Sequence, residues 1–164
     1  APPPDALKDE DEILAEQAQY WSEVPQENHI TTSAIQIRHA QPADFVNRSP
    51  LPPKQLCWMK TPERLPDNQR LHQCVLAYLS DWSLLDTAIR PHGISALTDN
   101  LQMASLDHAM WFHRPFRADE WLLYEQDSPV AGGARGFNRG LIYNQAGELV
   151  ASTTQEGLIR VPAG

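Results

Sequence analysis

The stretch DNQRLHQCVLAYLSDWSLLDTAIR, residues 67–90, carries the longest helical pattern in this chain. Its apolar side chains recur at intervals of four and three residues, at Leu71, Val75, Tyr78, Trp82 and Leu85. This spacing puts them on one face of a helix, and further apolar residues widen that face. We therefore predict one long helix that is buried over much of its circumference. Asp67 is the candidate N-cap, and Pro91 ends the pattern.

The segments that follow this helix alternate between apolar and polar residues in the manner of β-strands. Four consecutive strands are predicted there, over 103–113, 120–126, 134–144 and 149–161. The sequence NQAGE at 144–148 predicts a hairpin turn between the last two. Two further strands are predicted before the helix, at 34–39 and 54–60. One long helix packed against consecutive antiparallel strands is an α+β fold.

The first 33 residues differ from the rest in composition. They begin with the proline-rich APPPD, and residues 5–21 are acidic, with only a thin apolar stripe. We predict that residues 1–33 are a linker carrying an acidic surface helix and that residues 34–164 form one domain. Because the chain does not begin with Met, we expect a processed chain or a piece of a longer one.

Charge and composition exclude several classes of partner. The net charge is −8 and the isoelectric point is about 5.1, which argues against binding to duplex nucleic acid or to an anionic membrane. No apolar segment reaches the roughly 18 residues of a membrane span, and no signal peptide is visible. The two cysteines, Cys57 and Cys74, have no metal-type spacing. We expect them to be buried thiols of a protein in the reducing cytoplasm.

Residues 104–116, ASLDHAMWFHRPF, place serine, aspartate and histidine close together. In a continuous strand Asp107 and His108 point to opposite faces, and so do His108 and His113. A catalytic triad or a metal site built within this stretch is therefore not expected, and no GxSxG or HExxH motif occurs. We interpret Asp107 and both histidines as structural. No glycine-rich phosphate loop is present, so no cofactor is expected either.

Two polar residues lie within otherwise apolar patterns. Asp81 lies beside the apolar stripe of the predicted helix, and Gln155 lies in the last predicted strand. A partly desolvated Asp81 would be a better general base, whereas an Asp81 at the rim would only face solvent. Gln155 could orient a water molecule or could be an ordinary strand residue. The residues alone leave both alternatives open.

Several stretches resemble the C-terminal half of the type II acyl-CoA thioesterases, the family of bacterial TesB and the peroxisomal acyl-CoA thioesterases. They are HQCVLAYLSDWSLLDTAIRPHG, ASLDHAMWFHRPFRADEWLLYEQDSP, ARGFNRGLIYNQAGELVAS and TQEGLIR. The resemblance implies a hotdog fold, in which an antiparallel sheet wraps a long central helix. It also implies a polypeptide with two hotdog halves, of which this chain holds the second.

The resemblance further implies hydrolysis of acyl-CoA to free fatty acid and CoA without a covalent intermediate. By this resemblance Asp81 is the base that activates a water molecule, and Ser105 and Gln155 orient that water. Arg114, Arg117, Arg135 and Arg139 are cations that could meet the CoA phosphates. Trp82, Met110 and Trp111 could line an acyl channel.

The expected partners are the acyl-CoA substrate and either an N-terminal hotdog half or another copy of this chain, giving a homo-oligomer. An alternative is an isolated half that acts as a structural or acyl-CoA-binding module with little activity of its own. A weaker alternative is a dehydratase of related fold. That chemistry uses a histidine with a carboxylate, and the predicted helix offers only His72.

Overall fold

The computed structural model describes residues 1–17, 34–41, 49–94 and 101–160 of the chain. The N-terminal elements are the 3-10 helix η1 (Pro4–Ala6), α1 (Glu10–Gln17), β1 (Gln36–His39) and β2 (Lys54–Lys60). The helical region that follows comprises α2 (Gln69–Asp81), α3 (Asp86–Ile89) and the 3-10 helix η4 (Arg90–His92). The remaining strands are β3 (Gln102–Ser105), β4 (Ala109–Phe112), β5 (Leu122–Gly132), β6 (Arg135–Tyr143) and β7 (Leu149–Arg160).

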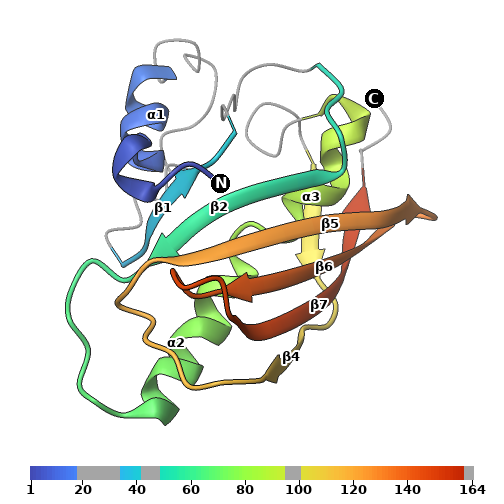
Figure 1. Ribbon diagram of the computed structural model, residues 1–164. Coiled ribbons are helices and arrows are strands. Elements are labelled where there is room, and N and C mark those ends of the chain that lie inside the picture. The colour runs from blue at the N-terminus through green and yellow to red at the C-terminus, as the bar shows by residue number, and fades with distance from the viewer. Residues whose placement is uncertain (18–33, 42–48, 95–100, 161–164) are drawn as a thin grey trace.

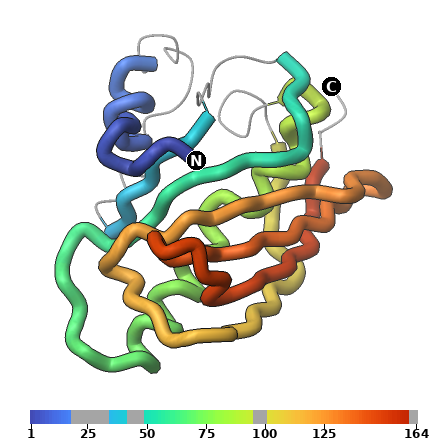
Figure 2. Tube along the Cα trace, viewed as in Figure 1, coloured from blue at the N-terminus to red at the C-terminus, as the bar shows by residue number. Residues whose placement is uncertain are grey.

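The strands form one sheet in the order β1-β2-β5-β6-β7-β3, and β4 also pairs with β7. Every described pair is antiparallel. Helices α2 and α3 lie against one face of this sheet (Figures 1 and 2). The core between the two layers includes Leu76 and Leu79 of α2 together with Tyr124 and Ile142 of the sheet. The predicted α+β fold, a long helix against an antiparallel sheet, is confirmed.

Helix α2 begins one residue later than the sequence indicates. Its N-cap is Asn68, whose side-chain oxygen accepts hydrogen bonds from the backbone N–H groups of Arg70 (3.0 Å) and Leu71 (3.4 Å). The predicted cap Asp67 instead pairs with Arg117, with 2.6 Å between Oδ1 and Nη1. Both residue types cap helices well, so the sequence pattern alone does not decide between these neighbours.

The buried face of α2 is also displaced from the predicted stripe. His72, Leu76, Leu79 and Ser80 are the buried residues of the helix. Tyr78, which was predicted to face the core, is 56% exposed. Val75 and Trp82 only pack against the border of the core. The predicted apolar stripe therefore lies along one border of the buried face, and Tyr78 points to solvent.

The predicted continuous helix over 67–90 is interrupted at residues 82–85, which form turns. Buried side chains of the sheet bind the carbonyl groups at this break. The Tyr124 hydroxyl donates to the Ser80 carbonyl at 2.9 Å, and Gln55 Nε2 donates to the Ser83 carbonyl at 2.7 Å. A helix can end without a stop signal in its own sequence when other groups satisfy its last carbonyls.

The predicted strand 103–113 is likewise two strands with a bulge between them. Ser105 pairs with Gly157 and Ala109 pairs with Thr154, so three residues of this edge (106–108) oppose two of β7 (155–156). The backbone N–H groups of Leu106 and Asp107 both donate to the Glu156 carbonyl, at 2.9 and 3.3 Å. An extra residue of this kind changes which face the following side chains occupy.

The hairpin turn and the N-terminal segment agree with their patterns where they are described. Gly147 adopts a positive φ of 80°, and Asn144 Oδ1 accepts from the Glu148 N–H at 2.9 Å. Helix α1 has no buried residue, as expected of a surface helix; residues 18–33 of the predicted linker lie outside the described ranges. Both cysteines are free, but only Cys57 is buried. The expectation of a buried Cys74 is wrong because it lies on the solvent side of α2.

Candidate functional site

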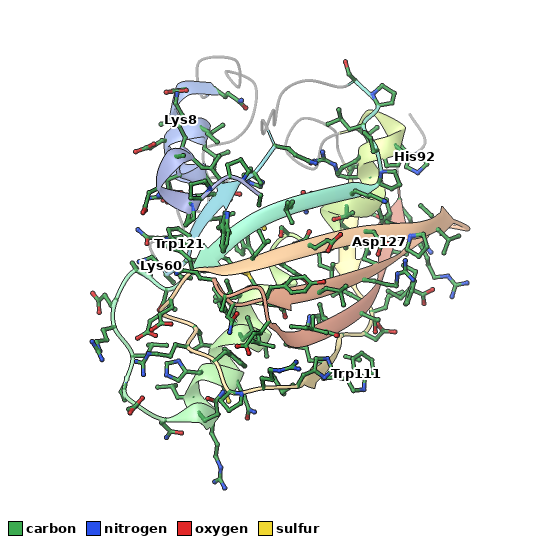
Figure 3. The ribbon with its side chains drawn as sticks, in the orientation of Figure 1. Lys8, Lys60, His92, Trp111, Trp121 and Asp127 are labelled. Atoms are coloured by element: carbon green, nitrogen blue, oxygen red, sulfur yellow. The ribbon has the colours of Figure 1, made fainter. Side chains whose placement is uncertain are left out.

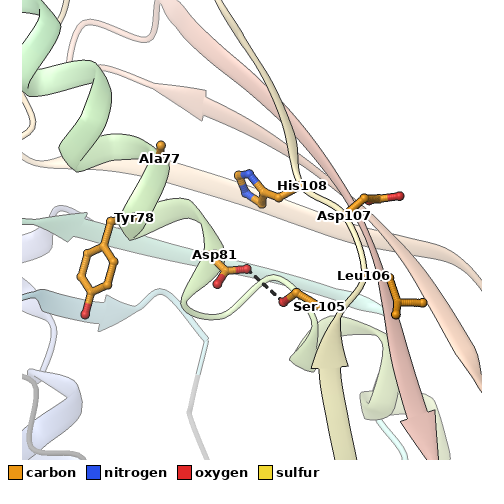
Figure 4. A pocket seen from close by; sticks show the side chains of 7 residues that line it. All are labelled: Ala77, Tyr78, Asp81, Ser105, Leu106, Asp107 and His108. Atoms are coloured by element: carbon orange, nitrogen blue, oxygen red, sulfur yellow. Dashed lines mark hydrogen bonds between the residues drawn. The ribbon is translucent and has the colours of Figure 1, made fainter.

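The three residues singled out from the sequence come from three elements and meet at one place. Asp81 is the last residue of α2, Ser105 the last residue of β3, and Gln155 lies in the middle of β7. Asp81 and Ser105 face each other across a pocket (Figure 4). The structure therefore brings all three together, although 74 positions separate Asp81 from Gln155.

Their hydrogen bonds form a closed triangle. Gln155 Nε2 donates to Asp81 Oδ1 and, at 2.8 Å, to Ser105 Oγ. The Ser105 hydroxyl in turn donates to the same Asp81 oxygen at 3.3 Å. Both amide protons of Gln155 and the single hydroxyl proton of Ser105 are thereby used. No hydrogen bond from the described residues reaches Asp81 Oδ2, so this oxygen is free to accept another proton.

Asp81 is positioned by contacts between the C-terminal end of α2 and the sheet. The Tyr124 side chain is fully buried, and its hydroxyl bonds the carbonyl of Ser80, next to Asp81. The Tyr124 ring passes over Gly140, where any Cβ would overlap it. Burial raises the pKa of Tyr124 well above 10, so its hydroxyl stays protonated and remains a donor. Gly140 and Tyr124 together fix the height of the helix end above the sheet.

The pocket has a volume of about 360 Å³ and is lined by Ala77, Tyr78, Asp81, Ser105, Leu106, Asp107 and His108. Asp81 and Ser105 are exposed, whereas Gln155 is completely buried beneath them. In this chain alone Asp81 is exposed at the rim of the pocket, which is the second of the two alternatives that the sequence left open. Among the described residues, no hydrogen-bond partner reaches the Gln155 Oε1 atom. Asn138, directly opposite on β6, is also buried, and neither of its side-chain polar atoms has a partner in the same part of the chain.

Asp107 and His108 line the pocket although the sequence analysis placed them outside the site. The bulge at 106–108 is the reason, because it lets Ser105 and His108 both face α2 despite their odd spacing. His108 Nε2 lies 3.1 Å from Ser80 Oγ and 3.2 Å from Thr153 Oγ1. His113 lies on the other face, with its Nε2 2.8 Å from Ser152 Oγ. A bulge needs knowledge of the pairing partner, so the sequence carried no signal for it.

No group of three or more metal-ligating side chains occurs within the described ranges. His72 is buried, and its Nδ1 accepts the backbone N–H of Ala118 at 3.1 Å, which commits the ring to a structural contact.

No helix in the described part of the chain is long and apolar enough to cross a membrane.

The arginines considered for CoA binding are engaged elsewhere. Arg117 forms a two-pronged pair with Asp119, which lowers the pKa of that carboxyl to about 2. Arg139 forms a similar pair with Asp127 on β5. Arg135 Nη1 lies 3.5 Å from Glu156 Oε2. Arg114 donates to the backbone carbonyl of Leu149. None of the four lines the pocket.

The fold and the site define the class of protein first. A protein from Alicyclobacillus acidocaldarius described as having a hot dog fold superposes on 99% of this chain with a TM-score of 0.69 at 15% identity, over 54% of its own length. A family model described as acyl-CoA thioesterase matches residues 29–158. The chain is thus a hotdog protein, and it belongs to the type II acyl-CoA thioesterase family.

Relatives of greater sequence identity lie within that family. The crystal structure of acyl-CoA thioesterase II TesB2 from Mycobacterium marinum is 44% identical, with a TM-score of 0.73 over 100% of this chain and 56% of its own. Acyl-CoA thioesterase 2 of Haemophilus influenzae is 37% identical over 96% of this chain and 55% of its length. Acyl-coenzyme A thioesterase 8 of mouse is 44% identical over 77% of this chain and 39% of its length. The chain spans about half the length of these relatives, or less.

Proposed function

We propose that this chain is one half of an enzyme that hydrolyses acyl-CoA thioesters to a carboxylic acid and CoA. The observation that carries the proposal is the triangle of Asp81, Ser105 and Gln155 at an open pocket. Family membership supports the choice of a thioester as substrate. The three residues of the triangle are also those that the family resemblance indicates.

The free oxygen of Asp81 supplies the base. A water molecule beside Oδ2 transfers a proton to the carboxylate while its oxygen adds to the thioester carbonyl carbon. The tetrahedral intermediate then breaks its carbon–sulfur bond, and the proton held by Asp81 passes to the departing thiolate. A base held in position contributes on the order of 10²- to 10⁴-fold to the rate. Thiolates leave readily, so no covalent intermediate is required.

Ser105 and Gln155 keep the carboxylate in one orientation. Their hydrogen bonds converge on Oδ1, which turns Oδ2 outward to the water. Gln155 is rigid because it is buried, and Ser105 also offers its oxygen toward the pocket. Holding reacting groups in this way contributes several kcal/mol by general estimates of orientation.

The second half of the site is proposed to come from another hotdog half, either an N-terminal one or a second copy of this chain. The exposure of Asp81 and Ser105 supports this, because acyl transfer benefits from a site closed to bulk water. The pocket lining includes two carboxylates and no lysine or arginine, so groups that bind the CoA phosphates belong on the partner. A cytoplasmic location stays a prediction from the free cysteines.

The direct test replaces Asp81 by asparagine in the active form of the protein, either this chain alone or joined to its partner half. We expect Asp81→Asn to lower kcat for acyl-CoA hydrolysis by about 100-fold, because the amide cannot accept the proton. The release of CoA thiol measures turnover, and circular dichroism reports the fold. The matched control is Asp11→Asn, on exposed α1. Unchanged turnover in Asp81→Asn would remove it from the mechanism.

Ser105 distinguishes water attack from a covalent route. We expect Ser105→Ala to retain measurable turnover at about a tenth of the wild-type kcat, and Ser105→Thr to restore most of it. Mass spectrometry of the wild-type protein mixed with acyl-CoA should find no acyl adduct. An acylated Ser105, or complete loss of turnover in Ser105→Ala, would replace the water mechanism with a serine nucleophile.

The alternative is a half that binds acyl-CoA or assembles without hydrolysing it. The observation in its favour is the openness of the site in this chain alone. Turnover measured together with solution mass by light scattering separates the two proposals. Hydrolysis that appears only with assembly supports the shared site, whereas assembly without hydrolysis under any condition supports the binding module.

A further inference from the structure

His108 touches two of the elements that carry the candidate site, and it lies three positions after the end of the third, β3. Its Nε2 atom lies between Ser80 Oγ of α2, at 3.1 Å, and Thr153 Oγ1 of β7, at 3.2 Å. Ser80 directly precedes Asp81, and Thr153 lies two positions before Gln155 on the same face of β7. His108 itself ends the bulge that begins after Ser105.

The protons on Ser80 and His108 limit which of the two side chains can donate to the other. The Ser80 hydroxyl has a single proton and two acceptors near it, the Ala77 carbonyl at 3.0 Å and Met110 Sδ at 3.3 Å. When its proton is given to either of them, Ser80 Oγ accepts a hydrogen bond from His108 in the tautomer that carries the ring proton on Nε2. In that tautomer the N–H lies between the two hydroxyl oxygens.

Asp107 anchors the same bulge from its other side. Its Oδ1 accepts the backbone N–H of Glu156 at 2.8 Å, while the Glu156 carbonyl accepts the N–H of Leu106 at 2.9 Å. The bulge is thus attached to β7 through Asp107 and to α2 through His108. The adjacent aspartate and histidine look like a catalytic pair in the sequence but make separate contacts.

We propose that His108 is a positioning residue that sets the place of Ser105 relative to Asp81 and Gln155. The proposal rests on the proposed hydrolysis at this site and adds a residue to it. The contacts of His108 Nε2 are with Ser80 and Thr153 and not with Asp81 or Ser105, so His108 acts through the elements it joins. A shift of about 1 Å in a reacting group can cost on the order of 100-fold in rate.

The test compares three histidine variants in the active form of the protein. His108→Ala removes the contacts and is expected to lower kcat by about 30-fold while KM changes by less than about threefold. His108→Gln offers an amide N–H in place of the ring N–H and is expected to recover most of the lost kcat. His113→Ala is the matched control, since it removes a contact between a histidine at the other end of β4 and a β7 hydroxyl, on the opposite face of the sheet. We expect its kcat to be unchanged.

A second measurement does not depend on turnover. Amide hydrogen exchange at Leu106 and Asp107 reports how firmly the bulge is held, because both N–H groups bond the Glu156 carbonyl. We expect His108→Ala to speed this exchange by about tenfold or more, and His108→Gln to restore protection. Should His108→Ala fail to fold, Thr153→Val removes one of the two contacts with little change of shape and should give a smaller loss of kcat.

The outcomes separate this proposal from the function itself. Absence of acyl-CoA hydrolysis in every form of the wild-type protein defeats the proposed function, while the exchange experiment still decides the role of His108. Hydrolysis that is equal in wild type and His108→Ala overturns the positioning role. So does an equal fall in kcat for His108→Ala and His113→Ala, or unchanged exchange at Leu106.

Discussion

The two edges of the sheet differ in whether other parts of the described chain lie against them. At the β1 edge, residues 1–17 lie alongside the strand, with α1 next to it (Figure 1). At the other edge, no strand of the described residues pairs with the outer side of β3 or β4. An open edge exposes unpaired backbone groups and invites another strand. The candidate site lies at the open edge, which indicates that this edge is the one available to a partner.

The covered edge is attached through polar groups. Trp58 Nε1 donates to the Pro2 carbonyl at 2.9 Å, and Arg38 Nη1 donates to the Pro4 carbonyl at 2.8 Å. On the other face of β1, His39 Nε2 lies 2.6 Å from Glu10 Oε2. Arg38 and Lys60 also lie over the ring of Trp121, near the end of β2 (Figure 3). This edge is closed by the chain itself.

The open edge has exposed apolar side chains around it. Leu106 is 55% exposed and Trp111 is 51% exposed, and Tyr78 on the neighbouring helix is 56% exposed. Large apolar groups in such a position are typical of a surface that another polypeptide covers. The comparison teaches that the described residues cover the edge remote from the site and leave open the edge that carries it. The predictions below test that difference.

The largest effect is expected from a charge at the open edge. Trp111→Glu, on β4 (Figure 3), should weaken association with the second half at least tenfold, because a carboxylate would be desolvated there. Hydrolysis should fall in parallel with assembly. Sedimentation velocity measures the association. Val130→Glu is the control, because Val130 is 60% exposed at the far end of β5. Equal weakening in both variants would remove β4 from the interface.

A smaller effect is expected at the covered edge. Arg38→Ala loses the hydrogen bond to Pro4 and the contact with Trp121, and should lower the free energy of unfolding by about 1–2 kcal/mol. Chemical denaturation measures this loss. Association and kcat per folded site should not change. The exposed Arg70 on α2 provides the control, Arg70→Ala. A larger loss of activity than of stability would show that the covered edge also serves the site.

The smallest effect is expected between the edges, at Asn138 of β6. Its two side-chain polar atoms are buried and have no partner in the described part of the chain, so Asn138→Leu should raise the free energy of unfolding by about 1 kcal/mol. That corresponds to a melting temperature about 2–4 °C higher. Turnover should stay the same. A lower melting temperature, or a fall in kcat, would show that Asn138 supports Gln155 on the neighbouring strand.

The sequence predicted most strands of the sheet, and it named the three residues that the structure brings together, although β5 extends to Gly132, beyond the predicted end at 126. Alternating patterns located β5, β6 and β7, because each of these strands has one buried face. The site residues came from resemblance, since nothing in the spacing of Asp81, Ser105 and Gln155 shows that they meet. Their meeting depends on pairing between β3 and β7, which are distant in the chain.

The misplaced features have a common physical cause. The helix break at 82–85 depends on Tyr124 and Gln55, which bind carbonyls from another layer. The bulge at 106–108 depends on how β3 and β4 align with β7. Neither is encoded in its own segment, so periodicity within that segment could not reveal it.

The bulge also makes the length of one short segment decisive. Because three residues oppose two, deleting Leu106 would restore ordinary alternation and leave Ser105 and His108 two positions apart, still on the α2 face but without the bulge. A substitution at Leu106 changes the chemistry of the pocket wall and leaves the contacts of Asp107 and His108 in place. Loss of a residue there would instead remove the bulge that Asp107 and His108 hold in place. We therefore expect natural variants of this chain to vary at Leu106 but to keep three residues between Ser105 and Ala109.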